Sequence, residues 1–271
     1  MPTPLEILLD PLSLVVLAVY AGLMGWELAF PGRVLPSVQH WRLKGTAFFF
    51  AFLLLSTYLP LLWDRYLAAW QLFDLTGLGD VGGAVAGLLI YEAVAYAWHR
   101  LMHATPLLWR SFHQMHHSAE RLDMAGAFYF SPLDMIGWSF VGSFALVLIV
   151  GLTPTAATGI VLATTLLAMF QHANIRTPRW LGYLVQRPES HTLHHGRGRH
   201  RDNYADLPVF DMLFGSFHNP KGYELPTGFY PGGSSRVLDM LLARDIGQQR
   251  LERDGGRRAP AIVSGTGRAS S

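Results

Sequence analysis

Five long apolar runs divide the chain, and polar or turn-forming residues separate them. They cover residues 11–30, 46–63, 81–98, 134–150 and 155–170. A helix needs about 20 apolar residues to cross a bilayer, and the first three runs reach or approach that length. The last two are shorter, so they form either two spans or a hairpin that enters the bilayer and returns. No alternating pattern indicates a strand. The runs predict an all-α integral membrane bundle of four to five membrane helices.

Histidines gather where the third run ends and again beyond the fifth. His99 and His103 are four residues apart, residues 113–117 read His-Gln-Met-His-His, and residues 191–195 repeat that spacing, with His172 between them. On a helix, residues three and four apart share a face, and neutral imidazole is a good ligand for iron, zinc and copper. Three such groups supply more nitrogens than one tetrahedral ion uses. The pattern therefore predicts two metal ions side by side.

The order of the runs decides whether these histidines can meet. If the third run ends at His103 on one side of the membrane, runs four and five must leave and return before His172. Of the 21 Lys and Arg residues, only Arg65 then falls on the opposite side. Because cytoplasmic loops carry an excess of positive charge, we expect a multi-pass protein with its histidines at the cytoplasmic face.

Composition supports a membrane protein and narrows the chemistry. Hydrophobic residues make up 51% of the 271 residues and charged residues 15%, against about 25% charged residues in an average soluble domain. The chain has no cysteine, which leaves histidine and carboxylate as metal ligands and excludes iron–sulfur sites. The net charge of +2, without basic residues interleaved with aromatics, gives no indication of nucleic-acid binding.

Metal ions held beside the hydrocarbon suit the oxidation of a lipid. Such a site can activate O2 at an unactivated C–H bond while water is kept away. Two other classes stay open. A metal transporter would place its ligands near the membrane midplane rather than at one face. A membrane zinc hydrolase would need one three-ligand site with a nearby base, and the surplus of histidines disfavours it.

Carboxylates near the histidines are candidates for supporting roles. Glu92 lies in the third run, seven residues before His99 and on roughly the same helical face. A carboxylate inside a membrane helix is costly and usually faces a partner. We expect Glu92 either to hold a ligand imidazole or to hydrogen-bond a neighbouring helix. Residues 202–204 are expected to close over the third histidine group, and Asp206 and Asp211 are weaker candidates for ligands.

The histidine series resembles the fatty acid hydroxylase/sterol desaturase superfamily of integral membrane oxygenases. The resemblance covers roughly residues 80–220 and extends to the run from Leu108 to His113 and the ending from Asn203 to Gly215. It implies a di-iron site, a helical cytosolic cap that carries the histidine boxes, and O2-dependent hydroxylation or desaturation of a lipid. The implied ligands are His99, His103, His113, His116, His117, His172, His191, His194 and His195. The residues expected to support them are Glu92, Asn174, His200, Asp202 and Asn203.

Two positions depart from the family pattern. Many members carry an Arg-Phe-His-Pro-Leu-Glu run where residues 129–134 read Tyr-Phe-Ser-Pro-Leu-Asp, which argues against a close relation to those members. Some members have a second histidine four residues after the one that matches His172. Here that position is Arg176, so the ligand shell is one histidine short or is completed by another group such as water.

We expect three parts: N-terminal membrane helices over 1–79, the catalytic domain over 80–220, and a C-terminal extension over 221–271 whose Gly-, Arg- and Ser-rich end is disordered. The expected cofactors are two Fe ions, with Zn as a substitute in a purified sample, and O2 is the co-substrate. Because the chain shows no nucleotide fingerprint or haem domain, electrons must come from a separate carrier or reductase. The lipid stays open among fatty acyl, sterol, carotenoid, ceramide and alkyl-glycerol classes, as does hydroxylation versus desaturation.

Overall fold

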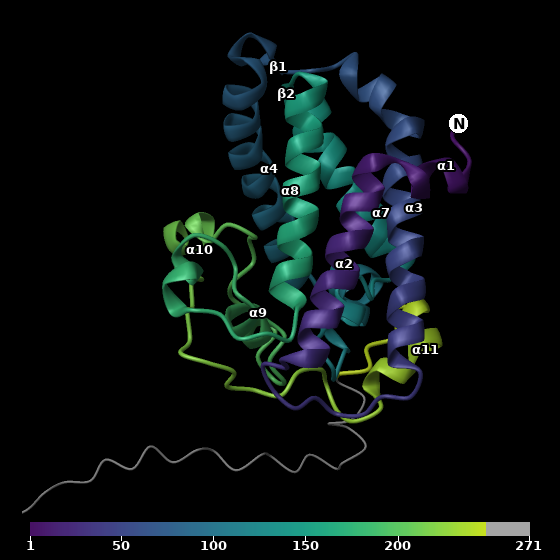
Figure 1. Cartoon of the computed structure of the whole chain (residues 1–271), viewed down its shortest axis with the longest axis vertical. Helices are drawn as coiled ribbons and strands as arrows, with labels where there is room; N and C mark the ends of the chain where they lie inside the picture. Colours follow the sequence, from purple (N-terminus) through teal and green to yellow (C-terminus); the bar gives the residue numbers. More distant parts are fainter. Residues whose placement is uncertain (248–271) are drawn as a thin grey trace, which may run out of the picture.

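The computed structural model describes residues 1–247, most of them in helices. Five helices are long and apolar enough to cross a membrane. They are α2 (Pro11–Ala29), α3 (Trp41–Ala68), α4 (Gly79–Ala104), α7 (Pro132–Ser143) with its continuation η4 (Phe144–Ile149), and α8 (Pro154–His172). Figure 1 shows them running side by side as one bundle. The predicted all-α membrane bundle is confirmed, and the two short runs form separate helices.

Short elements occupy the two ends of the bundle (Figure 1). At one end, β1 (Phe73–Asp74) pairs in parallel with β2 (Val150–Gly151), near η1 (Thr76–Leu78), and α1 (Pro4–Leu9) lies beside the N-terminus. Residues 105–131 and 173–247 form the other end, here called the cap. Its elements are α5 (Pro106–Leu108), η2 (Trp109–His113), α6 (Gln114–His117), η3 (Met124–Gly126), η5 (Arg179–Tyr183), α9 (Pro188–His194), α10 (Val209–Leu213), η6 (Gly233–Ser235) and α11 (Val237–Leu241). The disordered end predicted for the C-terminal extension lies outside the described residues.

Side-chain caps fix where the last two membrane helices begin. The hydroxyl of Ser131 accepts a hydrogen bond from the backbone N–H of Asp134, and the hydroxyl of Thr153 does the same for Ala156. A proline follows each capping residue, where its missing N–H costs nothing. Pro132 and Pro154 thus open the two helices. With its start fixed, α8 reaches the cap at its last residue, His172.

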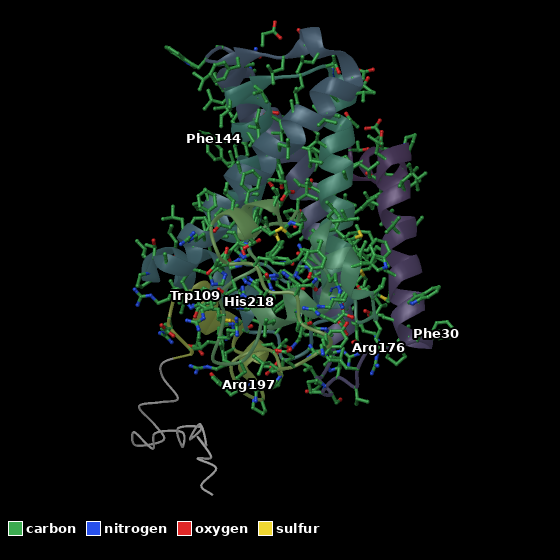
Figure 2. All side chains as sticks on the ribbon, turned by 90° about the vertical axis from the view of Figure 1, so that its left-hand side faces the viewer. Phe30, Trp109, Phe144, Arg176, Arg197 and His218 are labelled. Atoms are coloured by element: carbon green, nitrogen blue, oxygen red, sulfur yellow. The ribbon has the colours of Figure 1, made fainter. Side chains whose placement is uncertain are left out.

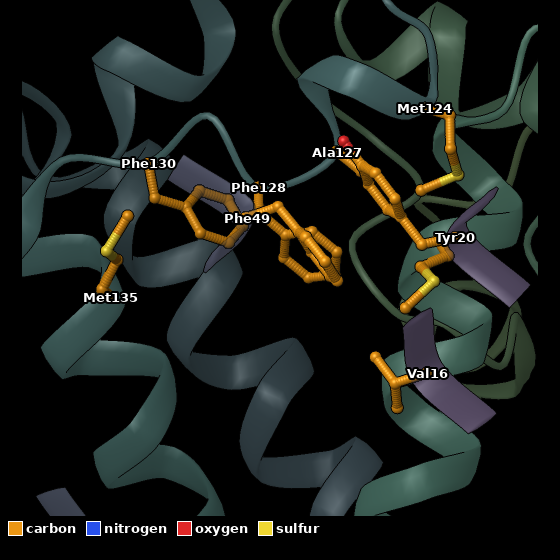
Figure 3. Close-up of a cluster of buried hydrophobic side chains, with 9 residues drawn as sticks. Val16, Tyr20, Phe49, Met124, Ala127, Phe128, Phe130 and Met135 are labelled. Carbon is orange, nitrogen blue, oxygen red and sulfur yellow. The ribbon is translucent and has the colours of Figure 1, made fainter. Parts of the chain in front are cut away.

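An aromatic and methionine core joins the N-terminal helices to the rest of the chain. Tyr20 from α2 stacks on Phe49 from α3 with ring centroids 4.0 Å apart, and Phe49 contacts Phe128 from the cap (Figure 3). Met135 from α7 and Met169 from α8 belong to the same cluster. The first two spans thus pack directly on the segments that carry the histidines. The division into three parts stays a prediction.

The outward faces of the long helices are apolar. Val85 on α4 is 60% exposed, Leu61 on α3 is 50% exposed and Val161 on α8 is 53% exposed. Monomeric soluble proteins rarely expose apolar patches of this extent, so lipid is the natural solvent of these faces. The chain is a membrane protein, as its composition predicted. Figure 2 shows nitrogen-bearing side chains gathered toward the cap, while carbon dominates the opposite half of the bundle.

Candidate metal centre

Nine histidines from four parts of the chain meet where α4 and α8 end against the cap. Within each of two groups, the candidate ligand nitrogens lie within 4.8 Å of one another. The five-histidine group contains His99, His103, His113, His117 and His194. The four-histidine group contains His116, His172, His191 and His195. The convergence predicted from the order of the apolar runs is confirmed, and these are the nine residues predicted as ligands.

In the five-histidine group, every Nδ1 atom has a partner outside the group. Three partners are backbone carbonyl oxygens, which only accept hydrogen bonds, so these three imidazoles carry their proton on Nδ1. The three pairs are His99 with Tyr204 at 2.7 Å, His103 with His200 at 2.8 Å and His194 with Asp202 at 2.6 Å. The Nδ1 of His117 lies 3.1 Å from the Nδ1 of His200. The Nε2 atoms of the group are left to face its centre.

Two of these Nε2 atoms face each other as bare lone pairs. His113 donates from Nδ1 to a carboxylate oxygen of Asp134 at 2.9 Å, and its Nε2 lies 3.0 Å from the Nε2 of His99. With both protons on Nδ1, no hydrogen bond can join the two Nε2 atoms. A cation between them removes this repulsion, and imidazole nitrogen is a ligand that iron and zinc accept. The donor set of this group therefore fits a metal ion.

The four-histidine group is also linked through Nε2 atoms. The Nε2 of His172 lies 3.1 Å from that of His116 and 3.0 Å from that of His191, which lies 3.1 Å from that of His195. His172 donates from Nδ1 to the carbonyl oxygen of Ala168 at 2.6 Å. The Nδ1 atoms of the other three rings are buried and make no hydrogen bond within residues 1–247. This group offers nitrogens for a second ion but orients only one of its rings.

Burial keeps the histidines of the cap neutral. Removal from water lowers the pKa of each ring well below its usual value, and neighbouring imidazoles lower it further. This holds for His113, His116, His117, His191, His194 and His195. Neutral imidazole is the form that binds metal, because its free nitrogen offers a lone pair rather than a proton. The electrostatics of the cap therefore match the proposed ligand role.

A short loop, residues 198–204, supplies the three carbonyl partners and is here called the strap. Its backbone is left-handed, with φ between 43° and 76°, at Gly198, His200, Asp202 and Asn203. Such conformations are uncommon for residues with a side chain and need support from their surroundings. The amide of Asn203 gives that support: it donates to the carbonyl oxygens of Ser190 and His218 and accepts from the backbone N–H of His218. The strap thus holds its carbonyl groups against three imidazoles.

The segment that carries this centre matches known proteins. Residues 84–216 match the fatty acid hydroxylase family. The ornithine lipid hydroxylase OlsE of Rhizobium tropici is 33% identical over 141 residues, which make up 50% of this chain and 42% of that protein. The alkylglycerol monooxygenase of Homo sapiens is 32% identical over 128 residues, 45% of this chain and 27% of that protein. Over this segment, which is just under half of its length, the chain resembles the fatty acid hydroxylase superfamily.

The resemblance seen in the histidine spacing is thereby confirmed. The chain spans less than half the length of either curated relative, so the match concerns the hydroxylase domain rather than the whole of those proteins. No solved structure matches the chain.

The hydroxylase domain contains a supporting carboxylate that sequence reasoning missed. Asp134 is fully buried at the start of α7, where its backbone N–H is capped by Ser131 and its side chain accepts from His113. A carboxylate behind a ligand imidazole fixes the ring and raises its basicity. The sequence signal was a serine, a proline and an acidic residue opening an apolar run, which is typical of a helix start. In the sequence, however, that stretch stands out mainly as a departure from the family pattern.

Two residues expected to support ligands have other partners. Glu92 accepts at Oε2 from the backbone N–H of Leu207 at 3.0 Å and contacts no imidazole. The observed partner is a cap residue outside the helices, rather than the imidazole or the neighbouring helix that was expected. The side chain of Asn174 accepts from the backbone N–H of Arg33 and donates to its carbonyl oxygen. These residues hold the domain together around the centre rather than its rings.

Most of the remaining candidates do support the histidines, through the strap. His200 and Asp202 give carbonyl groups to ligand candidates, as described for the strap, and Asn203 supports that loop. Asp211 accepts from the backbone N–H groups of Tyr204 and Ala205 and so also holds the strap. The exposed Arg176 donates from Nε to the carbonyl oxygen of Gly32 at 3.0 Å. The group that contains His172 therefore has one ring fewer than its neighbour.

A cavity of about 110 Å³ lies beside both groups. Histidines from each group reach it, and its apolar wall comes from α3, α7 and the cap, through Phe52, Trp138, Phe128 and Phe130. A second wall comes from α4, α8 and residues 204–206. The cavity is the space in which a substrate group would meet the metal centre.

Proposed function

We propose that the protein is a membrane-bound di-iron oxygenase that hydroxylates a C–H bond of a lipid. The observation that carries the proposal is the pair of adjacent histidine groups beside a partly apolar cavity, with inward nitrogens that need a cation. The names of the two relatives, an ornithine lipid hydroxylase and an alkylglycerol monooxygenase, support a lipid as the substrate. Nine nitrogens exceed what two four-coordinate zinc ions would take from protein, which favours iron.

The reaction sets what the chain must provide. Bound iron would supply the activation of O2 and the oxidation of the C–H bond. Hydroxylation consumes O2, two electrons and two protons, and it yields the alcohol and water. The electrons come from a separate carrier or reductase. The strap and Asp134 hold imidazoles in place, and Phe52, Phe128 and Phe130 exclude water and align an apolar chain.

We place the cap in the cytoplasm, where a soluble electron donor can reach it. The distribution of Lys and Arg supports this side. The chain has no cysteine, so a single cysteine introduced at an exposed cap position, such as Arg201→Cys, can be labelled selectively. An impermeant thiol reagent added to intact cells is expected to leave it unlabelled and to label it after the membrane is opened. Labelling in intact cells would reverse the orientation.

Metal analysis and oxygen uptake test the function. Protein purified in lipid nanodiscs is expected to contain about two irons per chain, as nine clustered imidazoles can ligate. With a chemical reductant and extracted membrane lipid it is expected to consume O2 and to form a lipid heavier by one oxygen. A His99→Ala, His191→Ala double variant is the control. One bound zinc, without O2 uptake, would contradict the proposal and favour a hydrolase.

A further inference from the structure

One wall of the cavity is polar, although it lies between membrane helices. Gln171, next to His172 on α8, and Asp206 from the cap both line it. The side-chain N–H of Gln171 donates to Oδ1 of Asp206 at 2.8 Å. The other carboxylate oxygen, Oδ2, makes no hydrogen bond in the part of the chain that the structure describes. An acceptor therefore faces the cavity with no protein donor assigned to it.

A second carboxyl group stands behind the first. Glu92 is fully buried, and its Oε1 has no hydrogen-bond partner among residues 1–247. The Glu92 and Asp206 side chains are close enough to interact electrostatically. Neither lysine nor arginine lines the cavity. Buried carboxylates are stable only when donors or positive charge reach them, and here the cavity is the open direction from which a donor can come.

The polar wall lies at the histidine end of the cavity. Tyr91 and Thr164, which also line the cavity, each precede a histidine of their own helix by eight residues, His99 and His172. Eight residues of α-helix span about 12 Å. Gln171 adjoins His172 and is hydrogen-bonded to Asp206, so both lie near the four-histidine group, while the cavity also extends along the helices into the bundle. At about 110 Å³, the cavity is smaller than the roughly 300 Å³ or more that encloses a whole small ligand, so it admits only the end of a lipid.

We propose that Asp206, positioned by Gln171, binds an ammonium or hydroxyl group at the polar end of the lipid substrate. The C–H bond that is oxidised then lies within a few atoms of that group rather than in the middle of an unfunctionalised chain. This inference rests on the proposed function and narrows its substrate class. An ammonium group is expected to bind more tightly than a hydroxyl group, because Glu92 stands behind Asp206 and no lysine or arginine lines the cavity.

Binding without turnover tests the subsite. The probes are dodecylamine, 1-dodecanol and dodecane, titrated calorimetrically into the metal-loaded protein in nanodiscs without reductant, with empty nanodiscs as the blank. We expect affinities in the order amine, alcohol, alkane, with the amine at least about tenfold tighter than the alkane, as a hydrogen bond to a charged group contributes. Asp206→Asn, whose amide oxygen can still accept from Gln171, is expected to remove most of this preference. The matched control, Asp239→Asn, changes a surface carboxylate on α11 that pairs with Arg244 and is expected to preserve it.

The outcomes separate this inference from the oxygenase proposal. Equal affinities for the three probes in the unmodified protein would overturn the subsite, and that comparison requires no variant to fold. A preference that survives in Asp206→Asn would overturn the role of Asp206. In both cases, two irons and lipid-dependent O2 uptake would leave the oxygenase proposal intact. Mass spectrometry of the product adds a second measurement, because oxygen inserted in mid-chain also contradicts the subsite.

Discussion

The five-histidine and four-histidine groups lie side by side and differ in how their rings are held. In the first, each Nδ1 faces a partner: three carbonyl groups of the strap, the Asp134 carboxylate and the His200 ring. In the second, only His172 has such a partner. Ring orientation is set before the metal arrives in one group and largely by the metal in the other. We therefore expect the five-histidine group to bind its ion more tightly.

Removing a ring from each group gives the largest expected contrast. His191→Ala leaves three rings, of which only His172 is oriented, so bound iron is expected to fall from about two ions to about one per chain and product formation to background. His117→Ala leaves four oriented rings and is expected to keep both ions at saturating iron. Elemental analysis and product mass spectrometry measure the two effects. Equal metal loss in the two variants would show that ligand orientation does not distinguish the groups.

The carboxylate behind His113 gives the next contrast. Asp134→Leu removes the acceptor for Nδ1, so iron affinity of the five-histidine group is expected to fall about 10- to 100-fold, as for other partners behind metal-binding histidines. Asp134→Asn keeps an acceptor oxygen and is expected to lose less. Competition with a chelator measures both affinities. If the leucine variant bound iron as tightly as the unmodified protein, the orientation argument would fail at this ring.

The strap can be loosened without touching a histidine of either group. Asn203→Ala removes three hydrogen bonds that hold the left-handed backbone. Iron affinity of the five-histidine group is expected to fall about tenfold, while the four-histidine group is unaffected. A stepwise iron titration followed by absorbance resolves the two events. Equal weakening of both steps would mean that the strap supports the whole cap rather than one group.

The smallest expected effect is a pH dependence at the wall beside the four-histidine group. Burial raises the pKa of Asp206 to about 7, although the hydrogen bond from Gln171 acts in the opposite direction. The groups that face it are Glu92 and Tyr91 from α4, Gln171 from α8 and neutral imidazoles. Because ammonium prefers the ionised carboxylate, dodecylamine affinity is expected to rise from pH 6 to 8 by less than about tenfold, while the amine itself stays protonated. Dodecanol, titrated in parallel, is expected to change less.

Much of the arrangement could be read from residue type and spacing. The apolar runs predicted the spans. Because two spans lie between His103 and His172, the chain returns to the same side of the membrane, which predicted that the histidines meet. The partition into two groups follows a spacing rule that became visible only in the structure. Rings four residues apart stay together, as His113 and His117 do, while His116 and His194 each join the group formed by the other segment.

The parts that could not be predicted are those that side-chain identity does not encode. His200 and Asp202 were expected to support the ligands, but they do so through backbone carbonyl groups, which every residue has, so the sequence could not show how they act. Glu92 was expected either to hold an imidazole on its own helical face or to hydrogen-bond a neighbouring helix. Its actual partner, the N–H of Leu207, is again backbone. Asp134 was visible in the sequence, but its pairing with His113 depends on how α7 packs against the cap.

His172 is the last residue of α8 and His103 lies in the last turn of α4. The candidate metal centre is therefore fixed at the ends of two membrane helices. Its depth relative to the lipid headgroups is then set by helix length and tilt. Membrane helices adapt to a thicker or thinner bilayer largely by tilting. Such a tilt raises or lowers the metal centre together with the helix ends. We therefore expect the hydrocarbon thickness of the host membrane to influence which carbon atom the proposed oxygenase oxidises.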